Sequence, residues 1–204
     1  MMKPIEAALS GSPLRALLGA ALLMALASCS SVPNIFGAKT AAMTRVYVDA
    51  QGGERAQLRM SVDGSGANGR VYPANSCPRW QEPRSGWVMT SVFGIPLFGT
   101  AHTGRSLGTR GAMEAKGLIS GEVYLRANEL VTLAYDMGTS DGHYNYGCLA
   151  GVAFTPVANH HYHAIARWVG RQQCAVMLFD VDEQGVAKPV QATPANLCEA
   201  VGKQ

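Results

Sequence analysis

Charged residues are scarce in this chain, and they do not gather into basic or acidic runs. Asp, Glu, Lys and Arg make up 15% of the 204 residues, and the formal net charge is +3. Nucleic-acid-binding domains need a basic face that neutralises phosphates, so the scattered basic residues exclude nucleic acid as a partner. An apolar content of 48% indicates a globular chain with a core rather than a disordered one.

The sequence also contains no arrangement of residues that predicts a catalytic site. Ser140, Asp141 and His143 are the residue types of a hydrolase triad, but they lie together in one glycine-rich stretch. Triad residues come from separate elements that meet in space. The stretch therefore predicts a turn, and we expect no catalytic residues and no cofactor.

No apolar run in the chain is long enough to predict a membrane-spanning helix. The longest runs from Ala16 to Ala27, about a dozen residues, whereas a spanning helix needs ~20. Lys3 and Arg15 precede it and supply positive charge. This order of charge and apolar residues is typical of a signal peptide, so we expect residues 1–28 to be removed.

The run ends in Leu26-Ala27-Ser28-Cys29, which resembles the lipobox of bacterial lipoproteins. The resemblance implies that Cys29 receives a diacylglyceryl group, becomes the new N-terminus and is acylated again. With ~0.8 kcal/mol for each buried methylene, two or three acyl chains anchor a protein permanently. Ser30 follows the cysteine, and a non-acidic residue there implies the outer membrane, with the periplasmic face favoured over the cell surface.

Residues 29–44 contain small residues with Pro33 and Gly37 and no hydrophobic period, which predicts a tether. Such a tether spans ~20 Å on average, so the domain would sit close to the membrane. Residues 45–204 are then long enough for one domain with a proper core.

The chain has no Cys-x-x-Cys pair, which argues against a structural zinc site. Besides Cys29 it has four cysteines, and an even number in an exported chain predicts two disulfides with three possible connectivities. Our preferred pairing is Cys174–Cys198 with Cys77–Cys148.

Alternating apolar and polar residues predict a mainly β domain. Ala56–Val62 alternates without a break, as a half-buried strand does. The residue order predicts further strands at 45–49, 87–93, 118–125, 130–135, 148–154, 161–169, 174–180 and 186–190, and a loop at 63–69. Short strands separated by Gly and Pro turns predict a single antiparallel β-sandwich. Thr193-Pro194 predicts a short C-terminal helical turn.

Two short motifs are similar to immunoglobulin-like lipoprotein domains of uncharacterised function. They are the strand–turn–strand run Ile119–Asp136 and Phe154-Thr155-Pro156 leading to Tyr162. The resemblance implies an immunoglobulin-like sandwich and no particular activity.

The run His160-His161-Tyr162-His163 is the one conspicuous group of candidate metal ligands. His161 and His163 would share a strand face, and imidazole suits zinc and copper. The sequence supplies no evident third ligand, although His102 and His143 are possibilities. We therefore predict solvated histidines and no metal site.

Two functions remain open. The first is a lipid-anchored, non-catalytic binding or structural module whose partner is another envelope protein or a cell-wall component. The second is a periplasmic lipoprotein that binds zinc or copper through the His160–His163 cluster.

Free-thiol counting tests the disulfide prediction. The denatured, unreduced mature protein should give close to zero free thiols, because Cys77, Cys148, Cys174 and Cys198 are all expected to be paired. Two or more free thiols per chain would refute it.

Overall fold

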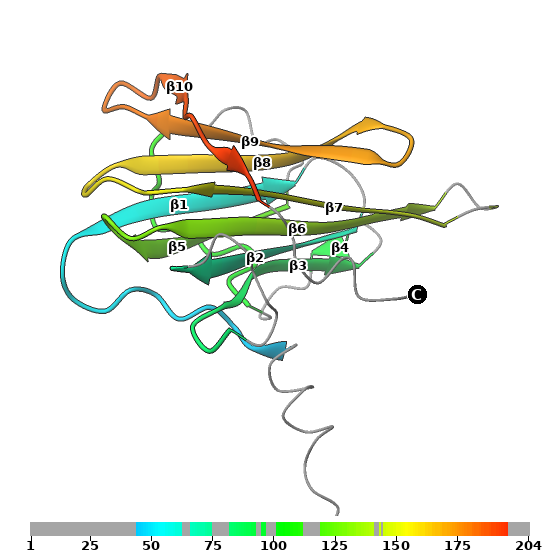
Figure 1. The fold of residues 1–204 in the computed structure, drawn as a ribbon, viewed down its shortest axis with the longest axis horizontal. Coiled ribbons are helices and arrows are strands. Elements are labelled where there is room, and N and C mark those ends of the chain that lie inside the picture. Colours follow the sequence, from blue (N-terminus) through cyan, green and yellow to red (C-terminus); the bar gives the residue numbers. More distant parts are fainter. Residues whose placement is uncertain are drawn as a thin grey trace, which may run out of the picture. The chain divides into compact units, whose positions relative to one another are not determined.

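The computed structural model in Figure 1 is built almost entirely from β-strands in two sheets. It describes residues 44–62, 66–74, 82–92, 95–96, 101–111, 119–140, 143 and 145–195. Residues 1–28 and all of the expected tether except Thr44 lie outside this part of the chain. So do Cys29, Cys77 and Cys198.

The first sheet has five strands in the order β10-β9-β8-β1-β5. Their bounds are β1 Arg55–Val62, β5 Ile119–Arg126, β8 His161–Gly170, β9 Gln173–Val181 and β10 Ala187–Pro189. The second sheet has six strands in the order β11-β7-β6-β2-β3-β4. Their bounds are β2 Ala67–Pro73, β3 Gly86–Val92, β4 Ile95–Pro96, β6 Val131–Ser140, β7 Asn145–Phe154 and β11 Thr193–Pro194.

Strand β1 lies inside its sheet, antiparallel to β5 and parallel to β8. The half-buried strand predicted from the alternation is confirmed: Leu58, Met60 and Val62 are fully buried on the inner face. Gln57 and Arg59 alternate with them and point to the outer face. The parallel pairing means that the sandwich is mostly, but not wholly, antiparallel.

The two sheets share one hydrophobic core, which makes the arrangement sandwich-like. Strands of both sheets contribute buried residues to a single cluster, including Leu58, Val123 and Leu178 from the first sheet and Val71, Leu133 and Met137 from the second. The buried hydroxyl of Tyr135 on β6 donates to the carbonyl of Ala164 on β8 at 3.0 Å. A buried Tyr needs such a partner, so this bond fixes one sheet against the other.

A disulfide also joins the two sheets, and it corrects the predicted pairing. Cys148 on β7 is bonded to Cys174 on β9, with Cα atoms 6.0 Å apart. The pairing of Cys148 with Cys77 and of Cys174 with Cys198 is therefore wrong. Loop length alone cannot decide connectivity, because facing positions on stacked sheets are set by strand order rather than by distance along the chain.

Most predicted strands are present, and the errors have local causes. Residues 45–49 form only an isolated bridge from Val46 to Trp87. Strand β2 overlaps the predicted loop at 63–69, because Asn68 and Gly69 pair with β6 despite their turn-like character. The predicted helical start at Thr193-Pro194 is strand β11, which pairs with β7. Its Thr193 hydroxyl donates to the carbonyl of Ala153.

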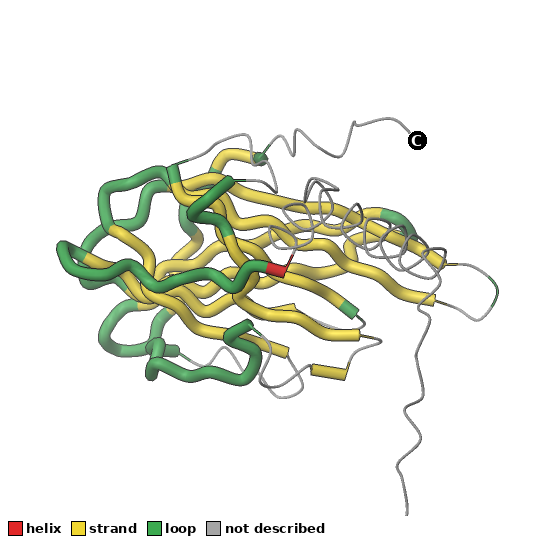
Figure 2. Tube along the Cα trace, turned by 90° about the horizontal axis from the view of Figure 1, so that it is seen from below, coloured by secondary structure: helices red, strands yellow, loops and turns green. Residues whose placement is uncertain are grey.

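The loops that join the strands gather at their ends, as the green segments of Figure 2 show. The starts of β1 and β8 and the end of β5 lie together, because Arg55 pairs with Arg126 and Gln57 pairs with His161. This end of the five-stranded sheet carries the polar residues described next.

Removing the inter-sheet disulfide should cost stability. The bond closes a loop with a sequence separation of 26, for which chain entropy gives about 3–4 kcal/mol. The double variant Cys148→Ala/Cys174→Ala should lose about this much in denaturant unfolding. Val169→Ala, at an exposed position, should change the free energy of unfolding by less than ~0.5 kcal/mol. A loss below ~1 kcal/mol in the double variant would contradict the expectation.

Candidate functional site

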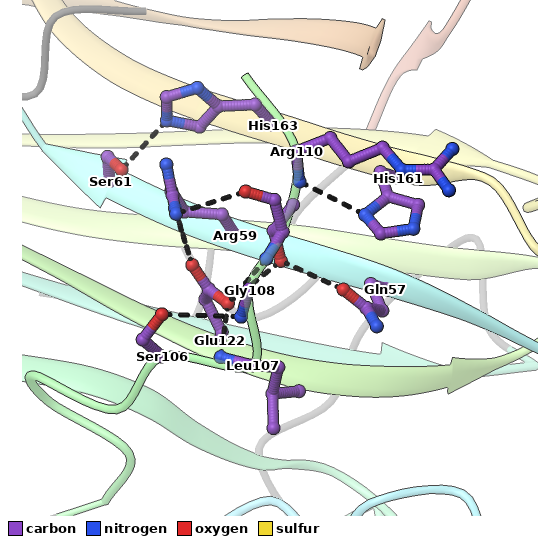
Figure 3. A network of polar contacts seen from close by, with 11 residues as sticks. Gln57, Arg59, Ser61, Ser106, Leu107, Gly108, Arg110, Glu122, His161 and His163 are labelled. Atoms are coloured by element: carbon purple, nitrogen blue, oxygen red, sulfur yellow. Dashed lines mark hydrogen bonds and ion pairs between the residues drawn. The ribbon is translucent and has the colours of Figure 1, made fainter. Parts of the chain in front are cut away.

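A buried carboxylate, Glu122 on β5, lies at the centre of a polar network on the outer face of the five-stranded sheet (Figure 3). Glu122 is only 1% exposed. Oε1 accepts from Nε of Arg59 on β1 at 2.6 Å. Oε2 accepts from the backbone N–H of Leu107, from the N–H of Thr109 and from the hydroxyl of Thr109. Both oxygens are therefore satisfied by the protein itself.

The segment 101–111 crosses this face and supplies those donors. The backbone N–H of His102 donates to Val88 on β3, and that of Gly104 donates to Ser120 on β5. Further along, Arg110 reaches β8, where its N–H donates to Nδ1 of His161 at 3.1 Å. The segment thus spans the sheet from the β5 edge to β8.

Gly121 lies opposite Met60, on the other face of β5 from Glu122, and it lets the start of the segment and β3 come close to β5 because a side chain would not fit there. A Cβ atom at Gly121 would lie 2.6 Å from the carbonyl oxygen of Val88 and 2.7 Å from that of His102. Glycine inside a strand often marks such a close backbone approach. A Gly inside a predicted strand was thus the sequence signal that could have indicated where the segment 101–111 meets β5.

The pKa of Glu122 lies below its usual value of 4.5. Burial raises this pKa, but the hydrogen bonds from Leu107, Thr109 and Arg59 stabilise the ionised form and outweigh the burial. Arg59 also donates to the carbonyl of Thr109 at 3.3 Å, so one guanidinium joins the carboxylate to the crossing segment.

His161 and His163 share one face of a strand, as predicted, but the prediction that His163 lies near the surface is wrong. His163 points to the same face of β8 as His161, yet it is 0% exposed. Its Nε2 is 2.9 Å from the hydroxyl of Ser61, and its Nδ1 has no partner among the described residues. Burial, reinforced by Arg59, lowers the pKa of His163 to about 4, so the ring is neutral at pH 7.

The other candidate metal ligands do not converge with these two. Nδ1 of His160 lies 2.7 Å from Oδ2 of Asp180. His102 contacts the carbonyl of Tyr47 and the guanidinium of Arg105. His143 is exposed. Within the part of the chain that the structure describes, no three His, Cys, Asp or Glu side chains form a group that could hold a metal ion.

The turn predicted to begin at Gly138 is wrong for residues 138–140, which are the end of strand β6. Gly138-Thr139-Ser140-Asp141-Gly142 matches the spacing G-x-S-x-G, which marks a nucleophile when it forms a strand-to-helix elbow. Here Gly138, Thr139 and Ser140 instead continue β6 and pair with β7 as far as Asn145. Residues 138–140 therefore belong to antiparallel strand pairing, and Asp141 lies outside the described residues.

A cleft of about 490 Å³ opens beside the Glu122 network, at the starts of β1 and β8. We call it the polar cleft; it is lined by Gly53, Glu54, Arg55, Gln57, Arg110, Tyr124, Asn159, His160 and His161. Of these residues, only His160 and His161 were candidates from the sequence. The others were missed because Arg110 and Tyr124 are far from β1 along the chain and meet it only in the folded sheet.

These features define a β-sandwich-like protein with a charged outer-face network and an adjacent polar cleft. No family model, curated protein or solved structure matches the chain. Among the residues that the structure describes, no helix is long and apolar enough to cross a membrane.

Buried His163 predicts a pH dependence of stability. Its pKa is about 4 in the folded protein and ~6.5 when unfolded. Between these values the unfolded chain binds more protons. The contribution of His163 is therefore complete above pH 6.5 and is lost as the pH falls towards 4, by about 3 kcal/mol in total. Glu122 adds a loss below pH 4.5, because its folded pKa is lowered.

Urea unfolding at a series of pH values measures this loss. His163→Gln should flatten the slope between pH 6.5 and 4, whereas His143→Gln, at an exposed position, should retain it. An unchanged slope in His163→Gln would show that the buried imidazole is not its source.

Metal titration tests the alternative reading of the histidine cluster. Because His163 is buried and His160 contacts Asp180, zinc and copper should bind no more tightly than roughly micromolar in calorimetry at neutral pH. Stoichiometric sub-nanomolar binding that is lost in both His161→Ala and His163→Ala would establish a metal site instead.

Proposed function

We propose that this chain is an exported lipoprotein, acylated at Cys29, whose domain is a non-catalytic binding or structural module of the cell envelope. The observation that carries the proposal is the Cys148–Cys174 bond between the two sheets. Structural disulfides form and persist in oxidising compartments, so this bond supports export. Leu26-Ala27-Ser28-Cys29 then supplies the site of acylation.

The chemistry of the buried groups supports binding rather than catalysis. Ser61 and His163 form a hydroxyl–imidazole contact, but both are fully buried and a substrate would not reach them. The oxygens of Glu122 are occupied by Arg59 and the crossing segment. A general acid or base must instead reach the reacting proton. The network therefore positions the segment 101–111.

The proposal includes an immunoglobulin-like arrangement of the sandwich. Its support is a core shared by two sheets and an inter-sheet disulfide, both of which occur in that class. The parallel pairing of β1 with β8 is a departure from a wholly antiparallel pattern.

We further propose that residues 29–44 tether the domain to the outer membrane on its periplasmic face. The support is the non-acidic Ser30 and a segment of small residues before Arg45. A partner at this position is a second envelope protein or a cell-wall component within ~20 Å of the membrane.

The test of this function is a single substitution at the proposed acylation site. Cys29→Ser removes the only thiol in the lipobox-like motif, so labelling with a fatty-acid probe should be abolished. The protein should then be recovered in unprocessed or soluble form. Cys198→Ser is the matched control, because it removes a cysteine outside the motif and should leave labelling intact. Fatty-acid labelling that persists in Cys29→Ser would rule out Cys29 as the anchor.

A further inference from the structure

We infer that the polar cleft binds an anionic group, a carboxylate or a phosphate, carried by the ligand of this domain. The inference deepens the proposed binding function and rests on it. It starts from the residues that meet at the cleft: two arginines from distant parts of the chain, two histidines, two amides and one tyrosine, with one acidic residue, Glu54.

The two arginines are available to a ligand. Arg55 places its guanidinium 4.6 Å from the ring centre of Tyr124, and no carboxylate that the structure describes pairs with it. Arg110 lies 3.6 Å from Glu183, but both side chains are exposed. An exposed pair of this kind is worth less than about 1 kcal/mol, so an incoming anion can replace it.

The acidic residues at or beside the cleft each have a partner within the protein. The carboxylate of Glu54 accepts from the amide of Asn128 at 3.0 Å. Asp180 lies against His160. Among the residues that line the polar cleft, two arginines stand against the single carboxylate of Glu54, and this excess of positive charge favours a negatively charged ligand.

His161 adds a neutral donor to the two charges. Its Nδ1 accepts a hydrogen bond from the backbone N–H of Arg110, so the proton of the neutral ring is on Nε2. Burial and the charge of Arg110 lower the pKa of His161, which keeps the ring neutral at pH 7. No described residue uses the Nε2–H group, so it can donate to a ligand oxygen.

The backbone that carries these groups is held in place before a ligand arrives. Arg110 follows Thr109, whose N–H and hydroxyl are bonded to Glu122. The carbonyl of Arg55 accepts from the N–H of Asn159, which lies in the left-handed region at φ 63°. The guanidinium groups that this fixed backbone carries can each bind a carboxylate or phosphate through paired hydrogen bonds. The buried network thus acts as support for the polar cleft.

Calorimetry on the acylated full chain in a non-ionic detergent tests the inference. The probes are glycerol 3-phosphate, glucuronate and uncharged glucose, at low salt. We expect saturable binding of at least one charged probe and none of glucose. The tighter of the two charged probes identifies whether a phosphate ester or a sugar carboxylate is the better ligand.

Arg55→Gln and Arg110→Gln should each weaken the binding at least tenfold. Arg171→Gln is the matched control, because Arg171 also lies over a tyrosine ring, at 5.1 Å from that of Tyr146, and is not among the residues that line the polar cleft. It removes the same charge and a contact with a tyrosine, and it should leave the affinity unchanged. Hydrogen exchange should slow at residues 53–57 and 107–111 when the probe is bound.

Absence of binding for both charged probes would overturn the inference. Equal weakening by Arg171→Gln would also overturn it, because the effect would then reflect net charge rather than this cleft. These outcomes are independent of acylation: loss of fatty-acid labelling in Cys29→Ser concerns the anchor, and the calorimetry concerns only the polar cleft.

Discussion

The burial of one carboxylate, Glu122, is the constraint on which the outer face of this domain depends. An ionised carboxylate loses several kcal/mol when it leaves water, and only good geometry with complete hydrogen bonding offsets that loss. Glu122 receives bonds from Arg59, Leu107 and Thr109. If the crossing segment moved away, two or more of these bonds would break together. The segment is therefore tied to the sheet by the buried charge of Glu122, whose Oε2 accepts hydrogen bonds from Leu107 and Thr109 of this segment.

The same constraint explains the order of polar groups across the sheet. Arg59 lies on β1 and Glu122 on β5, so their contact joins two neighbouring strands on the side away from the core. The segment above them carries Arg110 towards β8, where its backbone bonds to His161. The apolar core holds the sheets together, and the charged network determines which side chains the sheet presents to solvent. The two sets of residues alternate along β1, since a strand directs successive side chains to opposite faces.

Much of the fold could be predicted from the sequence, because strand periodicity is a local property. Ala56–Val62 predicted β1 from alternation alone, and its inner residues are buried as expected. Strand β2 was missed because Asn68 and Gly69 favour turns, and only their pairing with β6 and β3 makes them extended. Thr193-Pro194 has the residue types of a helix start, but these two residues pair with β7 and form strand β11.

The site was far less predictable, since it depends on contacts between distant residues. Nothing near Glu122 in the sequence indicates that Arg59 is its partner, because 63 residues separate the two. The histidines were visible as a cluster, but their environments differ: His163 is buried, His160 meets Asp180 and His161 lines the polar cleft. Cys148 and Cys174 were each predicted to form a disulfide, but with other partners. Their actual pairing depends on the stacking of β7 on β9, which the sequence does not reveal.

The place of β1 in its sheet has a consequence for how the chain folds. β1 is the first strand along the chain, but it lies between β5 and β8, and Ser61 meets His163 only after 102 further residues. Long-range pairing of this kind slows folding, because the loop must close before any contact is gained. A chain that emerges from its N-terminus can pair β1 with β5 first, but the other edge of β1 stays unpaired until β8 has appeared. During that interval the open edge of β1 is exposed to aggregation, and a holding chaperone would protect it.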